Sequence, residues 1–157
     1  KPIAKPPWPT RLSPAHAPES CQKITYRVVL PAGASTPKIA ICHCNGCKRN
    51  TGSAFSSNFM VPKATFTFTA GTPKLYLDST SSDSGQAIQR HFCGDCGSPL
   101  TAQGTVQHLI VIKAGTLDEE SRGQLDLAVE IFSKRKDKWA RASDGNSAHQ
   151  RRDDRPN

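Results

Sequence analysis

The feature that most constrains this chain is the spacing of its six cysteines. Three of them, Cys42, Cys44 and Cys47, lie within a stretch of six residues, and Cys93 and Cys96 form a C-x-x-C motif on a glycine-rich turn. Three thiols so close together cannot pair without leaving one over, and a bridge across C-x-C is geometrically tight. Disulfides and free structural thiols are therefore less typical of this pattern than zinc, which takes thiolates at about 2.3 Å in a tetrahedron.

The spacing alone leaves two assignments of zinc ligands open. The simpler is one four-cysteine structural site made of Cys44, Cys47, Cys93 and Cys96, which leaves the other two cysteines unexplained. The alternative is two sites, one for each cluster. In that case the short loop with three cysteines would leave a fourth tetrahedral position open, as catalytic zinc sites do. Three thiolates would also make the ion a soft Lewis acid, suited to holding a thiol as thiolate.

Alternating apolar residues predict short β-strands through the middle of the chain. The candidate segments are Ile24–Leu30, Thr65–Thr69, Leu75–Leu77, Ile88–Phe92, Val106–Ile112 and Leu125–Phe132. Clusters of proline, glycine and serine separate several of them, as expected for turns. No segment of ten or more residues shows a clean helical period of 3.6. We therefore predict a mainly β fold, a small antiparallel sheet domain over about residues 19–140, whose modest core would gain from a zinc staple.

The net charge of +8 lies mostly at the two ends of the chain. Residues 1–18 hold three basic residues, no acidic residue and six prolines, and residues 134–157 hold eight basic and four acidic residues. The stretch between them, residues 19–133, is nearly neutral, with ten basic and nine acidic residues. We expect residues 1–18 and 141–157 to be disordered arms. Such charge runs are usually solvated, so nucleic acid is not the expected partner.

Neither membrane insertion nor secretion is indicated. No apolar run approaches the ~18–20 residues of a membrane-spanning helix. The first residues also lack the apolar stretch of a secretory signal. We therefore expect a cytoplasmic protein that does not associate with membranes.

Four motifs in order carry a resemblance to a known family. They are Cys42–Phe55, His91–Leu100, Ala114–Asp118 and Glu130–Phe132, the last followed by Trp139. In this order they resemble the glutathione-dependent formaldehyde-activating enzyme family, which also includes centromere protein V. The resemblance covers roughly residues 19–140, and four ordered motifs are far more specific than a lone C-x-x-C.

The resemblance implies a β-tent fold with two zinc sites. The C-H-C-x-x-C cysteines would hold a catalytic zinc, which favours the two-site assignment. The second zinc would take Cys93, Cys96 and a C-x-C pair before the first strand, but here only Cys21 is present and Glu19 stands at the first position. Its fourth ligand would then be Glu19, His91 or water, unless the site is weak or empty. The expected content is one or two zinc ions per chain.

Residues that follow the thiol loop are candidates for substrate binding. Lys48 and Arg49 could receive carboxylates such as those of glutathione, although a solvated pair of bases is as common. Thr51, Gly52 and Phe55 offer a hydroxyl, backbone donors and an apolar wall beside the zinc. For Phe55 a place in the core is at least as typical.

Other titratable residues close to these motifs have simpler interpretations. His43 stands between two proposed ligands, and neighbouring residues in an extended turn point apart. We expect it to pack or to face the substrate, where it could shuttle a proton, rather than to bind zinc. His91 and Asp95 flank the second motif and could orient its ligands. Asp118 opens an acidic run that predicts a helix cap rather than a catalytic carboxylate.

The activity implied by the resemblance is that of a zinc-dependent carbon–sulfur lyase, similar to S-(hydroxymethyl)glutathione synthase. A thiol such as glutathione would add to formaldehyde or a related small aldehyde, or the adduct would be split. A larger carbonyl or thioether metabolite is the other possible substrate. The alternative is a non-catalytic, zinc-stapled module that docks on nucleic acid or another acidic polymer through its basic ends, as the centromere protein V branch suggests.

Overall fold

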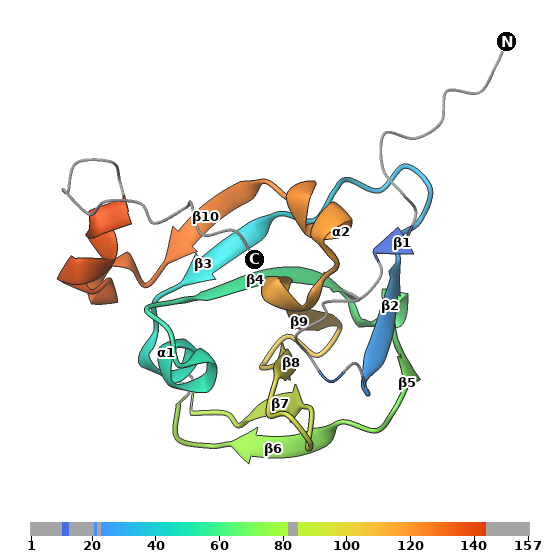
Figure 1. Ribbon diagram of the computed structural model, residues 1–157, viewed down its shortest axis with the longest axis horizontal. Coiled ribbons are helices and arrows are strands. Elements are labelled where there is room, and N and C mark those ends of the chain that lie inside the picture. The colour runs from blue at the N-terminus through green and yellow to red at the C-terminus, as the bar shows by residue number, and fades with distance from the viewer. Residues whose placement is uncertain (1–10, 13–20, 22, 82–84, 144–157) are drawn as a thin grey trace, which may run out of the picture.

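The computed structural model describes residues 11–12, 21, 23–81 and 85–143, with only the backbone described for residues 11–12 and 141–143. These residues form two β-sheets with short helices at their ends (Figure 1). Glu19, most of the predicted N-terminal arm and the tail beyond residue 143 lie outside the described residues. Of the predicted arm, residues 11–12 form a short strand that pairs with β2.

The two sheets differ in size but share an antiparallel design. The smaller has the order β1 (Arg11–Leu12), β2 (Thr25–Val29), β5 (Phe66–Ala70). The larger has the order β10 (Leu127–Ile131), β3 (Ile39–Cys42), β4 (Ser56–Pro62), β9 (Leu109–Lys113), β8 (Pro99–Gln103), β7 (Ile88–Phe92), β6 (Lys74–Asp78). Within the described part of the chain every strand pair is antiparallel except β10 with β3. The prediction of a mainly β fold is confirmed.

The hydrophobic core lies where the two sheets face one another. Its buried side chains come from β2, β4, β9 and the turn after β9: Tyr26, Val28, Phe59, Val61, Ile110, Ile112, Ala114 and Leu117. Tyr26 and Val28 are the inward members of the alternating pattern in β2, whose other side chains are more exposed. In β10 the alternation of apolar residues does not separate buried from exposed side chains, because every residue of this edge strand is exposed.

Periodicity predicts six of the strands, and the structure adds β3, β4 and β8 to the larger sheet. β4 and β8 carry polar residues on faces that the fold buries, Ser56 and Asn58 in β4 and Thr101 and Gln103 in β8, so their sequences lack the apolar alternation by which strands are recognised. β3 is apolar throughout but only four residues long, so it shows no alternation either. The polar residues of β4 are the ones that lie beside the first cysteine cluster.

Among the described residues, two α-helices and two 3₁₀ helices lie between strands, and two more 3₁₀ helices follow β10. They are α1 (Asn45–Thr51), α2 (Glu119–Gly123), η1 (Lys63–Thr65), η2 (Ala114–Thr116), η3 (Ser133–Arg135) and η4 (Lys138–Ser143). Asp118 caps α2, because its Oδ1 accepts a hydrogen bond from the Ser121 amide at 2.6 Å, so the predicted cap is confirmed. None of the described helices is long and apolar enough to span a membrane.

The connection from β3 to β4 positions the first cysteine cluster. Cys42 is the last residue of β3, and α1 begins three residues later. The thiol loop is therefore partly helical, whereas the sequence predicts an extended turn. The helix ends at Gly52, whose φ of 60° is left-handed and favours glycine. The chain then enters β4 at Ser56, which lies directly opposite Cys42. The cysteines are thereby held against one end of the larger sheet.

Candidate metal centre

The first cysteine cluster forms a compact group of sulfur atoms. The Sγ atoms of Cys42, Cys44 and Cys47 all lie within 4.8 Å of one another. Zinc–sulfur bonds of about 2.3 Å in a tetrahedron place sulfurs about 3.8 Å apart, so the three thiols fit such an ion. The first turn of α1 contributes, because the Cys47 amide donates to Cys44 Sγ at 3.3 Å. This donor set suits a soft cation such as Zn²⁺.

The thiols of this cluster interact with one another before any metal binds. A hydrogen bond from Cys47 lowers the pKa of the Cys42 thiol, although burial opposes this shift. The same hydrogen bond and burial raise the pKa of Cys47. Metal binding requires these thiols as thiolates, so we expect the cluster to hold the ion more tightly as the pH rises.

The second cluster joins segments that are distant in sequence. The Sγ atoms of Cys21, Cys93 and Cys96 lie within 4.8 Å of one another, and those of Cys21 and Cys93 are 3.4 Å apart. Hydrogen bonds from Ser98 lower the pKa of Cys96 to about 6, which favours its metal-binding thiolate form. All six cysteines are free thiols in two groups of three, rather than one group of four with two left over.

Of the candidates for a fourth ligand in the second cluster, only His91 is described, and it is not part of the group. Its Nδ1 lies 3.1 Å from Thr101 Oγ1, and its ring lies 5.8 Å from that of Phe68. Asp95 forms an exposed ion pair with Lys23 at 3.4 Å. Three cysteines are thus the ligand set that the described residues offer here.

His43 is fully buried between the cysteines and β10, with 1% of its surface exposed. Its Nε2 lies 3.2 Å from Glu130 Oε2, and its ring meets that of Phe55 edge-on at 5.9 Å. This hydrogen bond lowers the pKa of Glu130, and because a carboxylate only accepts, Nε2 carries a proton. Nδ1 has no partner among the described residues. The sequence motif contains Glu130, but nothing in its pattern pairs it with His43.

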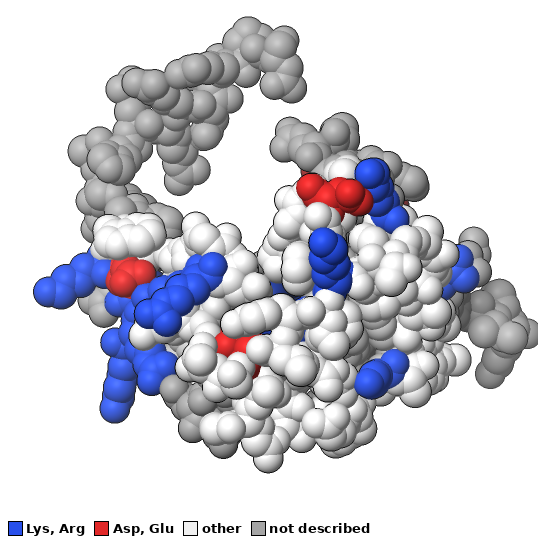
Figure 2. Space-filling model, turned by 90° about the horizontal axis from the view of Figure 1, so that it is seen from below, with Lys and Arg blue, Asp and Glu red and all other residues white. Residues whose placement is uncertain are grey.

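Lys48 is occupied by the segment that follows β10. Its Nζ lies 2.7 Å from Asp137 Oδ2 and donates to the Arg135 carbonyl oxygen at 2.6 Å. These contacts hold η3 and η4 beside α1. Lys134, Arg135 and Lys138 of this segment are exposed. Figure 2 shows a group of Lys and Arg side chains on one side of the molecule.

The other residues predicted to contact the substrate also lie on the connection between β3 and β4, and two of them stabilise α1 itself. The Thr51 hydroxyl donates to the Cys47 carbonyl oxygen at 2.9 Å, and Gly52 ends α1. Phe55 is 38% exposed and Arg49 is exposed. Substrate binding by these residues and by Lys48 stays a prediction.

Two variants distinguish docking by Lys48 from substrate binding. Lys48→Ala and Asp137→Asn both remove the ion pair, so both should speed amide hydrogen exchange in η3 and η4, at a cost in stability of at most ~1 kcal/mol. If Lys48 also receives a substrate carboxylate, only Lys48→Ala raises KM, because Asp137→Asn leaves the lysine free. The same KM in both variants would contradict substrate binding by Lys48.

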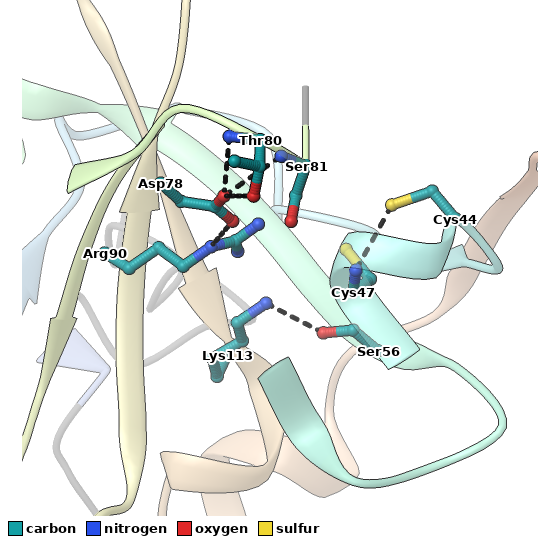
Figure 3. A network of polar contacts seen from close by, with 8 residues as sticks. All are labelled: Cys44, Cys47, Ser56, Asp78, Thr80, Ser81, Arg90 and Lys113. Atoms are coloured by element: carbon teal, nitrogen blue, oxygen red, sulfur yellow. Dashed lines mark hydrogen bonds and ion pairs between the residues drawn. The ribbon is translucent and has the colours of Figure 1, made fainter. Parts of the chain in front are cut away.

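A buried polar network lies beside the first cluster and has no signature in the sequence (Figure 3). Arg90 Nε donates to Asp78 Oδ2 at 2.8 Å, and Asp78 Oδ1 accepts from the amides of Thr80 and Ser81. Burial alone would raise the pKa of Asp78, but Arg90 and Ser81 lower it to about 2. Nearby, Lys113 Nζ donates to Ser56 Oγ and Asn58 Oδ1, both at 2.9 Å. Sequence reasoning missed these residues because no local pattern links them: they lie in or next to β4, β6, β7 and β9, which only the strand order of the sheet brings together.

Comparisons with known proteins bear on this arrangement. The profile of the family described as "Glutathione-dependent formaldehyde-activating enzyme" matches residues 16–135. A Fusarium vanettenii protein named "putative glutathione-dependent formaldehyde-activating enzyme" is 36% identical over 67 residues, or 43% of this chain and 34% of that protein. This chain therefore spans about a third of the length of the curated relative that it matches.

A solved structure of a Rhodobacter sphaeroides protein is similar in fold, with a TM-score of 0.50 and 15% identity over 74% of this chain and 100% of that chain. This likeness concerns the fold alone. The family profile, in contrast, matches well over half of the chain, and residues 16–135 include all six cysteines of the two clusters. The chain belongs to the glutathione-dependent formaldehyde-activating enzyme family.

Proposed function

We propose that this protein is a zinc-dependent carbon–sulfur lyase that joins a thiol such as glutathione to a small aldehyde, or splits the adduct. The observation that carries the proposal is the grouping of three thiol sulfurs within 4.8 Å. No fourth histidine, cysteine or acidic residue of the described ranges belongs to this group. Three protein ligands with an open fourth position are typical of catalytic rather than structural zinc. Family membership supports the same reaction class.

Cys42, Cys44 and Cys47 would hold the zinc ion. When bound there, zinc supplies a soft Lewis acid that favours the thiolate form of a thiol near neutral pH. In the reaction the thiol sulfur forms a bond to the carbonyl carbon, and the proton lost by sulfur ends on the former carbonyl oxygen as a hydroxyl group. The reverse reaction breaks the carbon–sulfur bond and returns the proton to sulfur.

The described residues would contribute mainly by orientation. The first turn of α1 fixes two of the sulfurs, and the hydrogen bond between the buried His43 and Glu130 of β10 anchors the loop between Cys42 and Cys44. Holding two reactants in a productive geometry can supply much of the acceleration of such an addition. The second cluster also offers three cysteines, but Glu19, a candidate for its fourth ligand, lies outside the described residues. We assign a structural zinc to this cluster, because it ties Cys21, which precedes β2, to the turn between β7 and β8.

Metal content and thiol chemistry test this proposal together. Elemental analysis of the purified full chain should give two zinc ions per chain. In exchange experiments on glutathione and ¹³C-formaldehyde, the zinc-loaded protein should accelerate formation and breakdown of the adduct over the spontaneous rate. A fully loaded protein that neither binds glutathione nor changes the exchange rate would contradict the proposal and favour a non-catalytic binding module.

A further inference from the structure

Lys113 is a buried cation for which the described residues provide no carboxylate. It ends β9, and only 5% of its surface is exposed. Its Nζ donates to two neutral acceptors, Ser56 Oγ and Asn58 Oδ1. By contrast, the buried Arg90 and the half-buried Lys48 each have an aspartate partner. A buried charge without a counter-charge is costly, so the surroundings of Lys113 should include a negative group.

The hydrogen bonds around Lys113 fit an ammonium group. Ser56 Oγ directs its own proton to Asn58 Oδ1 at 2.8 Å, so both oxygens accept from Nζ. No described side chain donates to Nζ, which fits an ammonium group, because such a group has no lone pair to accept a hydrogen bond. An ammonium group has three protons, and these two acceptors use two of them.

The first cysteine cluster is a source of negative charge that the strand register places close to Lys113. Ser56, which accepts from Lys113, is the residue opposite Cys42 across β3 and β4, and Asn58 is opposite Lys113 itself across β4 and β9. The side chain of Lys113 thus extends along β4 toward the end of the sheet that carries α1, and Figure 3 shows its Nζ directed toward Ser56 and α1. Burial and the charge of Arg90 lower the pKa of Lys113, whereas the thiolates of all three cysteines raise it.

The other buried cation beside this cluster does not supply a net charge. A Cβ atom built on Gly46 would lie 3.3 Å from Arg90 Nη2, so the guanidinium group packs against the first turn of α1. Its charge is already balanced by Asp78 at 2.8 Å. Lys113 is therefore the described residue that adds an uncompensated positive charge to this end of the sheet.

We infer that Lys113 is a positioning residue that makes the Cys42, Cys44 and Cys47 centre selective for an anionic fourth ligand, namely a thiolate, over a neutral one. This inference rests on the proposed function. Zn²⁺ with three thiolates has one net negative charge, and a fourth thiolate adds a second. In a poorly solvated site a nearby ammonium group stabilises the more negative state, whereas a neutral donor such as imidazole gains nothing from it.

The test uses the full chain loaded with Co²⁺, whose absorption bands report the ligands. Glutathione and imidazole are titrated in parallel at one pH, and the ratio of their affinities is the quantity compared, because it does not depend on the folded fraction. Cys47→Ser removes a ligand from the first cluster, so the absorption that remains in this variant is that of Co²⁺ in the second cluster. Lys63→Gln is the matched control, because Lys63 Nζ also donates to a neutral oxygen, that of Gln103 at 3.0 Å, but follows the opposite end of β4.

Lys113→Gln keeps a hydrogen-bonding side chain and removes the charge, so it should lower the glutathione-to-imidazole ratio at least about 10-fold. Lys113→Met should lower it as much, Lys113→Arg should restore most of it, and Lys63→Gln should leave it unchanged. Wild-type protein that binds glutathione with the same ratio as Lys113→Gln would overturn the inference alone. Wild-type protein whose spectrum does not respond to glutathione would overturn the proposed function and the inference with it.

Discussion

Replacing Cys47 by serine should remove one of two zinc ions per chain and slow the thiol–aldehyde reaction at least about 100-fold. Loss of a group that merely supports a metal ligand costs 10–100-fold in affinity or activity, so loss of a ligand should cost more. Cys47 is a suitable position because its sulfur belongs to the first cluster while its side chain is only half-buried. Elemental analysis and the ¹³C-formaldehyde exchange rate measure the two effects.

Cys96→Ser is the matched control for this variant. It removes one sulfur from the second cluster, where Cys96 is exposed. We expect it to lose the other zinc ion and to lower the melting temperature, while the exchange rate per folded molecule stays close to that of the wild type. If Cys47→Ser kept the wild-type rate, or if Cys96→Ser lost as much activity at a temperature where it is folded, the assignment of the reaction to the first cluster would be wrong.

Replacing Asp78 by asparagine should lower the free energy of unfolding by about 3–5 kcal/mol, because it leaves the guanidinium group of Arg90 buried without its counter-charge. Both side chains of this pair are 6% exposed, so water cannot take over the role of the carboxylate. Urea unfolding of the zinc-loaded protein at neutral pH measures the change. Asp126→Asn is the control, since Asp126 is exposed and its variant should stay within about 0.5 kcal/mol of the wild type.

The same pair predicts a dependence of stability on pH. The pKa of Asp78 is about 2 in the folded protein, below the value of about 3.9 for an unfolded aspartate. A lowered pKa means that the contribution is complete above about pH 4 and is lost as the pH falls toward 2. The stability difference between wild type and Asp78→Asn should therefore shrink over this range. A difference that is small at neutral pH, or that does not change on acidification, would contradict the assigned role.

The polar residues around the first cluster could not be predicted from the sequence. Ser56, Asn58 and Lys113 lie on neighbouring strands, and each has ordinary residues beside it in the chain. Their common role arises only because β4 lies between β3 and β9. Lys48 shows the opposite case, since its sequence position next to the cysteines suggests a substrate contact, while the fold brings Asp137 to it from the end of the chain.

The sequence by itself determined what depends on near neighbours. The spacing of Cys42, Cys44 and Cys47 brings three thiols together because so few residues separate them, and the alternation in β2 selects Tyr26 and Val28 for the core. Only the tertiary structure decided what depends on distant segments. Cys21 lies beside Cys93, 72 residues away, because the smaller sheet packs against the larger one, as the contact of Phe68 in β5 with His91 in β7 also shows. The cysteine spacing had left one site or two as alternatives. The buried polar residues beside the first cysteine cluster were likewise decided by the tertiary structure. Strand order sets which polar residues face each other, and no local pattern in the sequence encodes it.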